Sequence, residues 1–192
     1  MNTNTKDMLL QSGYEIFYEK GYHGAGLNDI LKKAGVPKGS FYHYFENKEA
    51  FLVEVLQYYK QKAREGMSPF LMDKDKPALE RFRAYIGGMI EGCEVCSCTG
   101  GCFFGNMAQE MSDSSEVVRE SIQGGIQAWY QGLEQFFIAA QKEGTLSSEY
   151  CTNELANMFV DGWQGALLRM KVEKTTEPLH RFLNGFLKIL SM

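Results

Sequence analysis

The amino-acid sequence predicts an all-α protein with two domains, an N-terminal helical domain over residues 1–65 and a second helical domain over residues 66–192. Apolar residues recur every three or four positions through long segments, which is the period of an amphipathic helix. Glycine or proline stands where these segments end, as expected at helix boundaries. A polar turn from Asp73 to Pro77 separates the two groups of helices and marks the boundary between the domains.

The helices can be placed in chain order from this pattern. A first helix is expected from Thr5 to Lys20, where Gly21 ends it. Two short helices follow between residues 27 and 45. Longer ones are expected at about residues 48–65, 77–93, 103–111, 114–142, 148–172 and 177–190. The break after residue 65 depends on the segment Met67-Ser68-Pro69, because proline interrupts a helix.

The composition is that of a globular protein, with 192 residues, 44% of them hydrophobic and 23% charged. No apolar run approaches the roughly 18 residues that would span a bilayer, and the first residues lack the order of a signal peptide. We therefore expect a cytoplasmic protein with no membrane partner. The five cysteines, an odd number, indicate free thiols rather than a disulfide framework.

The net charge of −4 is unevenly distributed along the chain. Residues 1–60 hold seven lysines and seven acidic residues, so the whole excess of negative charge lies in residues 61–192. Between Ile30 and Lys48 there are four lysines and one glutamate. This local excess of positive charge suits a surface that meets nucleic-acid phosphates.

The segment from Leu27 to Lys48 predicts a helix-turn-helix motif. Ile30, Leu31 and Ala34 share one helical face, and Gly35 follows where a left-handed cap ends the helix. Pro37 restarts the chain as a second helix that reaches Phe45.

The second helix of the motif should bury Phe41 and Phe45, which are four residues apart. Its open face would then carry Lys38, Ser40, Tyr42 and His43. A polar and aromatic face of this kind is typical of a helix that lies in the major groove of DNA.

Asn47 is predicted to cap the next helix, which places Lys48 in the first turn of that helix. A cation is disfavoured there by the helix dipole, whereas a bound phosphate would reverse the effect. We therefore expect Lys48 to contact the DNA backbone; the alternative is a solvated surface lysine.

The stretch GYHGAGLNDILKKAGVPKGSFYHYFENKEAFL resembles the DNA-binding domain of the TetR family of bacterial repressors. The resemblance implies that Ser40, Tyr42 and His43 face bases or phosphates, and that Lys38, Gly39 and Lys48 hold the phosphate backbone. It also implies a homodimer on a palindromic operator of double-stranded DNA, released by a small-molecule inducer. The sequence departs from the family at Ala25-Gly26, where a threonine or serine pair is usual, so a helix cap and a phosphate contact are missing.

By the same resemblance the last two helices meet their twins in a four-helix dimer interface. The candidate interface residues are Phe159, Gly162, Ala166, Met170, Phe182, Phe186 and Ile189. An intramolecular core is the alternative, because the apolar pattern alone does not distinguish the two.

The segment CEVCSCTGGC, with Cys93, Cys96, Cys98 and Cys102, indicates either a soft-metal site or a reactive thiol. The spacing is too tight for an ordinary zinc site and no histidine lies nearby, so we predict no metal site and no cofactor. The segment from Gly101 to Asp113 is similar to a TetR subgroup that represses reductases and lyases acting on reactive electrophiles. That similarity makes Cys102, just before a short helix, the candidate sensor thiol; an inert buried cysteine is the alternative.

A second set of aromatic and methionine side chains is a candidate lining for a ligand pocket, although residues at helical spacing more often form a core. The set comprises Tyr85, Met89, Phe103, Phe104, Met107, Trp129, Tyr130, Phe137 and Trp163.

The sequence thus predicts a DNA-binding transcriptional regulator, a repressor released by a small molecule or a thiol-reactive electrophile. The alternative is a thiol-based redox or metal-responsive protein that uses the Cys93–Cys102 cluster. An enzyme is disfavoured because the sequence has no phosphate-binding glycine loop and no constellation of cysteine, histidine and aspartate.

Overall fold

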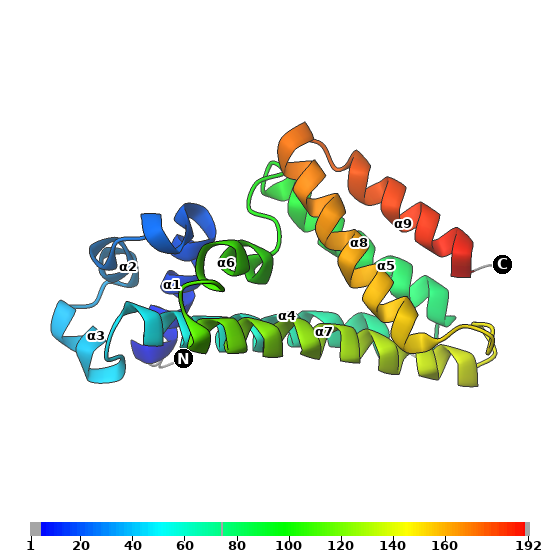
Figure 1. Cartoon of the computed structure of the whole chain (residues 1–192), viewed down its shortest axis with the longest axis horizontal. Coiled ribbons are helices and arrows are strands. Elements are labelled where there is room, and N and C mark those ends of the chain that lie inside the picture. The colour runs from blue at the N-terminus through cyan, green and yellow to red at the C-terminus, as the bar shows by residue number, and fades with distance from the viewer. Residues whose placement is uncertain (1–4, 74, 191–192) are drawn as a thin grey trace. The chain divides into compact units, whose positions relative to one another are not determined.

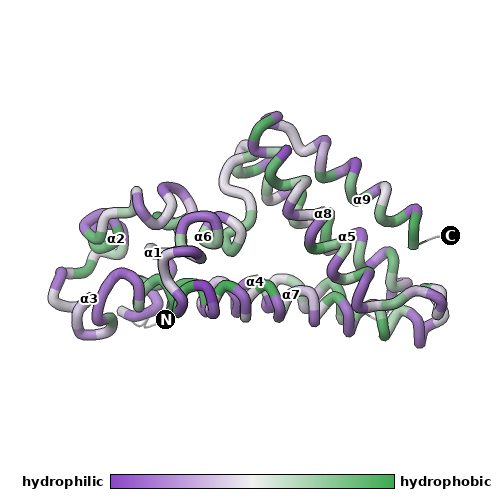
Figure 2. Tube along the Cα trace, viewed as in Figure 1, coloured by the Kyte–Doolittle hydropathy of each residue, from purple (hydrophilic) through white to green (hydrophobic). Residues whose placement is uncertain are grey.

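The computed structural model describes residues 5–73 and 75–190, and this part of the chain is helical with no β-strand. The predicted all-α class is confirmed (Figure 1). The helices are α1 (Thr5–Gly24), α2 (Leu27–Ala34), α3 (Lys38–Tyr44), α4 (Lys48–Leu71), α5 (Ala78–Val95), α6 (Phe103–Met111), α7 (Glu116–Lys142), α8 (Thr152–Glu173) and α9 (Glu177–Leu190). Polar and apolar residues alternate along these helices, as amphipathic packing requires (Figure 2).

The helices form two compact units that are not simple halves of the sequence. Unit one contains the chain up to Ala63 together with Phe103–Ile126, and unit two contains Arg64–Cys102 and the chain from Gln127 onward. The predicted division at residues 65 and 66 lies close to the first crossing between the units. Helical periodicity does not reveal what a buried face packs against, so the sequence pattern offers no way to assign α6 and the start of α7 to a unit.

Unit one is built around aromatic side chains from α1, α3 and α4. The Phe51 ring lies 5.1 Å from the Phe41 ring and 4.7 Å from the Phe45 ring, measured between centroids. Gly13 allows this packing, since a Cβ atom at that position would be 2.3 Å from the Phe51 ring. Helix α6 adds Phe103, whose ring lies 5.1 Å from the Tyr14 ring.

Unit two has its own core of phenylalanine rings around Phe82. The Phe82 ring lies 5.5 Å from the Phe137 ring and 5.0 Å from the Phe159 ring, and all three side chains are fully buried. Helices α8 and α9 pack closely because Gly162 leaves room for the Phe182 ring.

Helix α4 corrects one predicted boundary, because it continues through Pro69 to Leu71 rather than ending near residue 65. Proline removes one backbone N–H donor, but Pro69 lies in the last turn of the helix, so only a single turn follows the missing hydrogen bond. The end of the helix is held by unit two: the buried Arg81 side chain donates to the carbonyl oxygen of Leu71 at 2.7 Å. This tertiary contact has no counterpart in the local sequence pattern.

Among the described residues, no helix has the combination of length and apolar character needed to cross a bilayer.

Candidate functional site

The turn between α2 and α3 has the predicted geometry. Gly35 adopts the left-handed conformation, with φ 67° and ψ 28°, and the backbone N–H of Val36 donates to the carbonyl oxygen of Leu31 at 3.2 Å. Pro37 then precedes α3 with extended φ and ψ. The predicted glycine cap is confirmed, and together with Pro37 it fixes the angle at which the second helix of the motif starts.

Helix α3 separates its side chains as the sequence predicts. Phe41 and Phe45 are buried, while Tyr42 is 54% exposed. The other candidate DNA contacts on this helix are accessible: Lys38, Gly39 and His43 are exposed and Ser40 is half-buried. The outer surface of α3 therefore presents hydrogen-bonding groups on a helix that is anchored by two aromatic rings.

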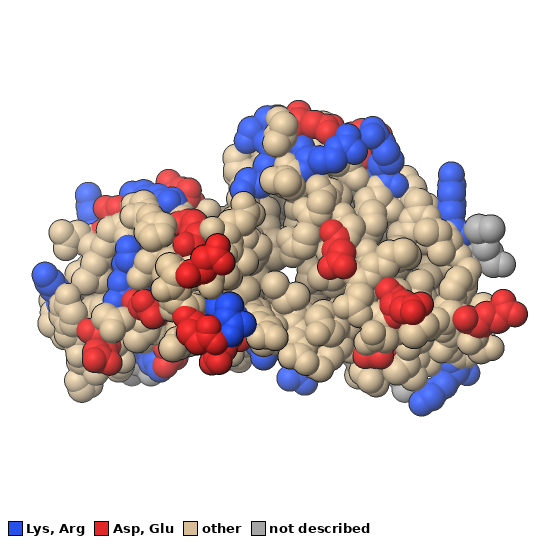
Figure 3. Space-filling model, viewed as in Figure 1, with Lys and Arg blue, Asp and Glu red and all other residues tan. Residues whose placement is uncertain are grey.

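The charges around the motif are mixed rather than strongly basic. On the visible face of unit one, acidic and basic side chains are interspersed (Figure 3). Several of the lysines are paired on this surface: Lys33 with Glu15 at 2.7 Å and Lys20 with Asp29 at 2.8 Å. These exposed pairs contribute little to stability, but they reduce the positive potential available for non-specific binding to DNA.

Asn47 caps α4 as predicted, because its side-chain oxygen accepts a hydrogen bond from the N–H of Ala50 at 2.8 Å. The side chain of Lys48 contacts the backbone of its own chain. Its ammonium group donates to the carbonyl oxygen of Tyr22 at 2.9 Å and to that of Ala25 at 3.1 Å, and it lies 4.2 Å from the centre of the Tyr22 ring. Burial lowers the pKa of Lys48, against an opposing effect of the Glu110 carboxylate.

Lys48 is therefore already bound to the segment that joins α1 and α2. The sequence pattern did not predict these intramolecular hydrogen bonds, and the contact of Lys48 with the DNA backbone stays a prediction. The physical reason for the bonds is that the Tyr22 carbonyl at the end of α1 and the Ala25 carbonyl just after it have no acceptor role within a helix. An ammonium group with three donors satisfies both.

The start of α2 lacks a side-chain cap, as the Ala25-Gly26 departure predicted. Gly26 occupies the capping position and makes no side-chain hydrogen bond. Its carbonyl oxygen accepts from the N–H of Asp29 at 3.1 Å. The position is set by backbone contacts and by Ala25, which is 2% exposed.

Glu110 on α6 is a contact that sequence reasoning did not assign to a site. Its carboxylate accepts a hydrogen bond from the backbone N–H of His23 at 3.1 Å. Gly21 lies directly against the same carboxylate and has φ 71°. The connection between α1 and α2 is thus held from one side by Lys48 and from another by Glu110. A glycine that ends a helix was the only available signal, and it did not identify the partner.

The cysteine segment follows the end of α5 and forms a helix-terminating turn. The N–H of Cys98 donates to the carbonyl oxygen of Cys93 at 2.9 Å, and the N–H of Ser97 donates to that of Glu94 at 2.8 Å. This pair of bonds is the Schellman cap. Cys98 is buried and Cys93 is half-buried. The burial of the Cys93 thiol raises its pKa to about 11, with a smaller contribution from the neighbouring Cys96 and Cys98.

Among the described residues, no group of three histidine, cysteine, aspartate or glutamate side chains has an arrangement that would hold a metal ion. Cys102 is half-buried and immediately precedes α6. It follows Gly100 and Gly101, both with positive φ, so the backbone at this point is shaped by glycine before the helix begins.

The candidate pocket residues do not form one set. Phe103, Phe104 and Met107 belong to the buried core of unit one, and the other six belong to unit two. Within unit two, Phe137 is fully buried and Trp163 is 1% exposed, whereas Met89, Trp129 and Tyr130 are half-buried. Helical spacing grouped residues that belong to separate cores.

Most of the candidate interface residues pack within the single chain. Phe159, Ala166, Met170 and Phe186 are buried within a single chain, and Gly162 and Phe182 pack against each other between α8 and α9. Of the predicted set only Ile189 is exposed, at 41%. The residues exposed on the other face of α8 are Met158, Leu168 and Val172. Most of the set is therefore already covered within one chain, and its part in a dimer interface stays a prediction.

An all-helical chain with an anchored helix-turn-helix near its N-terminus defines a DNA-binding regulator. Residues 9–55 match the family described as "Bacterial regulatory proteins, tetR family", and residues 78–186 match the "Tetracyclin repressor-like, C-terminal domain". The chain belongs to the TetR family of transcriptional regulators. The resemblance drawn from the sequence is confirmed, and the family and the relatives below are regulators rather than enzymes.

Three relatives align with most of the chain. The transcriptional repressor DhaR of Mycobacterium sp. strain GP1 is 36% identical over 94% of this chain and 89% of its own length. The transcriptional regulator AcuR of Cereibacter sphaeroides is 36% identical over 93% and 81%. The transcriptional repressor NemR of Escherichia coli K12 is 30% identical over 94% and 90%.

Solved structures show the same fold. The reduced form of Escherichia coli NemR superimposes with a TM-score of 0.88 at 29% identity, over 96% of this chain and 95% of that one. A regulatory protein TetR from Rhodobacter sphaeroides gives 0.86 at 36% identity, over 93% and 95%. The function predicted from the sequence, DNA-binding regulation, is confirmed, and the thiol-based or metal-responsive alternative is not favoured.

Proposed function

We propose that this regulator is a repressor whose homodimer binds a palindromic operator in double-stranded DNA and leaves it when a small molecule binds unit two. The observation that carries the proposal is the outer face of α3, where Tyr42 is 54% exposed beside the accessible Lys38 and His43. An aromatic side chain this exposed gains little from packing, whereas it offers a ring and a hydroxyl to a base edge. The relatives named as repressors support repression rather than activation of transcription.

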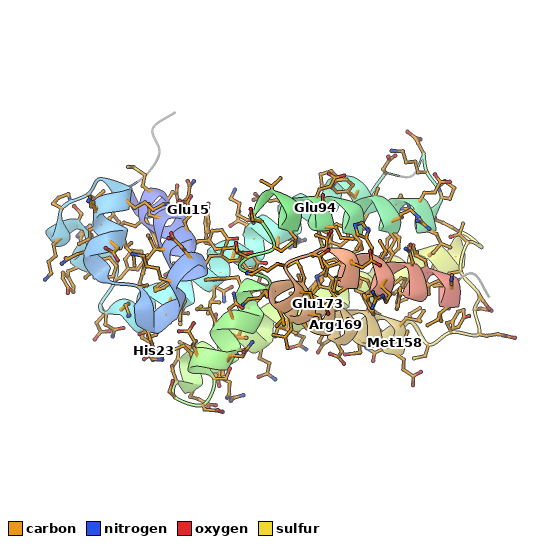
Figure 4. All side chains as sticks on the ribbon, turned by 90° about the horizontal axis from the view of Figure 1, so that it is seen from above. Glu15, His23, Glu94, Met158, Arg169 and Glu173 are labelled. Atoms are coloured by element: carbon orange, nitrogen blue, oxygen red, sulfur yellow. The ribbon has the colours of Figure 1, made fainter. Side chains whose placement is uncertain are left out.

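The dimer would form through the outer faces of α8 and α9. Leu168 and Val172, one helical turn apart on α8, are 57% and 78% exposed, and Ile189 on α9 is 41% exposed. Gly165 has no side-chain neighbour within 4 Å of a Cβ position, so a second helix can approach closely there. Arg169 and Glu173, which are paired at 2.7 Å on the same helix, would lie at the polar rim (Figure 4).

An inducer would act by linkage between its own binding and the binding of DNA. A ligand lowers operator affinity only to the extent that it binds the DNA-free conformation more tightly. We propose that a reversible ligand uses the unit-two members of the pocket set, and that a thiol-reactive electrophile would use Cys102. A ligand at Trp129, Tyr130 or Phe137 would act on α7, which contributes residues to each unit, and an adduct at Cys102 would act at the start of α6, in unit one.

The test is selection of bound DNA from a random duplex pool, followed by binding measurements on the enriched sequence. We expect two inverted half-sites about one helical turn apart, because a two-fold dimer presents two copies of α3. Tyr42→Ala should lose the preference for that sequence while retaining binding to random DNA. Tyr44→Ala, which removes a neighbouring exposed aromatic side chain of α3, is the matched control. A pool without an enriched inverted repeat would contradict the proposal.

A further inference from the structure

The outer face of α3 carries few of the side chains that pair with a base edge through two hydrogen bonds. Arginine and lysine read guanine in this way, and asparagine and glutamine read adenine. Helix α3 contains no arginine, asparagine or glutamine, and Lys38 is its single residue of this kind. Its other exposed side chains are the aromatic ones of Tyr42, His43 and Tyr44. Paired hydrogen bonds can therefore supply little of the sequence preference of this helix.

Lys38 is better suited to the phosphate backbone than to a base. Its ammonium group lies 5.9 Å from the centre of the Tyr42 ring, which is one helical turn further along the same face. Lysine is a point charge on a flexible stem, so it can meet a phosphate from many directions but does not fix the plane of a base. With Lys38 on the backbone, Tyr42 is the large side chain of this face that is left for the bases.

Tyr42 offers a rigid apolar surface. The residue is 54% exposed, while its ring meets the fully buried Phe41 ring edge-on, with centroids 5.4 Å apart and planes at 87°. The Phe41 ring is held in turn by the Phe51 ring at 5.1 Å. A tyrosine that is braced in this way has little side-chain freedom to lose when it contacts DNA. Its ring is therefore a preformed face for an apolar group.

Gly39 leaves space beside that ring. It is exposed and lies three positions before Tyr42, on the same side of the helix, and a Cβ atom there would meet no side chain within 4 Å. A base edge can thus approach the helix backbone next to Tyr42. Tyr44 is placed less well, because it is the last residue of α3, is 38% exposed and has the His43 ring against its own at 4.9 Å.

The apolar group that the major groove exposes is the 5-methyl group of thymine, since the other features of its base edges are hydrogen-bond donors and acceptors. We propose that Tyr42 selects thymine in each half-site by packing its ring against this methyl group, in the space beside Gly39, while Lys38 holds a nearby phosphate. This role of Tyr42 rests on the proposed function, because that function places α3 in the major groove of an operator.

Deoxyuridine tests the role directly, because it keeps every hydrogen-bonding group of thymine and lacks the methyl group. We would replace each thymine of the selected operator in turn, in both half-sites together, and measure the Kd of the full-length protein by fluorescence anisotropy at one salt concentration. Burial of one methyl group changes affinity about fourfold, so a contact made in two half-sites should cost about tenfold to twentyfold. If no substitution by deoxyuridine weakens binding, or if the half-sites contain no thymine, the proposal is wrong.

Two variants of Tyr42 test whether its ring makes the contact. Tyr42→Ala should bind the thymine and deoxyuridine operators equally, because the ring that covers the methyl group is gone. Tyr42→Phe should keep most of the difference, because it loses only the hydroxyl. Tyr44→Ala is the matched control and should discriminate as the parent does, with thermal unfolding confirming the fold of each variant. Discrimination that persists in Tyr42→Ala, or that disappears in Tyr42→Phe, would overturn the assignment.

Guanine provides the opposing test. Replacing each guanine by 7-deazaguanine removes the N7 acceptor, and we expect a smaller loss of affinity than at the critical thymine. A larger loss would show that hydrogen bonds to guanine carry the preference, which would contradict the proposal.

The outcomes also separate this role from the proposed function. An inverted repeat that binds equally well with deoxyuridine would overturn the role of Tyr42 and leave the proposed function standing. An enriched sequence without an inverted repeat would contradict the proposed function, and deoxyuridine in that sequence would still test Tyr42.

Discussion

At the scale of single residues, the structure distinguishes a lysine that is hydrogen-bonded within the fold from one that is exposed to solvent. Lys48 donates to two backbone carbonyls, whereas Lys38 is exposed on α3 and has only a distant contact with the Tyr42 ring, at 5.9 Å. A residue pattern cannot make this distinction, because the carbonyls come from a segment more than twenty positions away.

Lys48→Ala should lower the free energy of unfolding by about 1–2 kcal/mol, because two carbonyls lose a charged donor. Operator affinity should fall with little change in its dependence on salt. Lys38→Ala should leave stability unchanged and reduce the slope of log affinity against log salt by about one for each lost phosphate contact. Chemical denaturation and mobility shifts at several salt concentrations give both quantities. A reduced salt slope with normal stability in the Lys48 variant would instead mean that Lys48 does reach phosphate.

Cys93 should be a slow nucleophile, because its pKa is raised to about 11 by burial. At neutral pH very little of it is the reactive thiolate. Its alkylation by iodoacetamide should rise about tenfold for each pH unit between 7 and 10, as measured by mass spectrometry of the native protein. A labelling rate that levels off below pH 9 would show that Cys93 is an ordinary thiol.

Cys102 remains our candidate for an electrophile sensor, since it is half-buried at the start of α6. A small adduct at a packed helix start costs about 1–3 kcal/mol of overpacking, enough to shift a two-state equilibrium by one to two decades. Cys102→Ser should bind operator yet fail to release it after treatment with N-ethylmaleimide. Cys151→Ser, at an exposed position, should respond as the parent does. Normal release by the Cys102 variant would remove it as the sensor.

At the scale of elements, the sequence predicted what is encoded locally. The glycine cap of α2, the asparagine cap of α4 and the buried phenylalanines of α3 follow from residues within one or two turns, so they could be predicted. The end of α4, the partner of α6 and the interior of the α8–α9 pair depend on contacts between distant segments. For the same reason the exposed α3 residues could be predicted from the sequence, while the contact of Glu110 with the α1–α2 connection could not.

The contact of α6 with the α1–α2 connection gives an element-level prediction. Glu110→Ala removes the acceptor of the His23 N–H and should lower the free energy of unfolding by about 1 kcal/mol. Gly21→Ala should cost more, because the residue has φ 71° and the new Cβ would be 2.4 Å from the Glu110 carboxylate. The two changes should be less than additive in a double-mutant cycle by denaturation. Gln109→Ala, at an exposed position on α6, serves as control; strict additivity would show that the contact carries no energy.

At the scale of the whole molecule, the proposed mode of regulation requires that two copies act together. We expect one α3 with few basic neighbours to bind DNA weakly, so that affinity comes from two half-sites held by one dimer. Any change that weakens the dimer should therefore weaken operator binding even though it lies far from α3 in the sequence.

Val172→Asp is the sharpest test of this dependence. Val172 is 78% exposed on α8, so the substitution should leave the fold of the monomer intact. In the dimer the new carboxylate would be buried between two apolar helices without a partner, which is strongly unfavourable. We expect the dimer dissociation constant to rise at least about tenfold by sedimentation velocity, with a matching loss of affinity for a two-half-site operator and none for a single half-site. Val117→Asp, at a position 58% exposed on α7, should change neither. A Val172 variant that sediments as the parent does would place the dimer interface elsewhere on the chain.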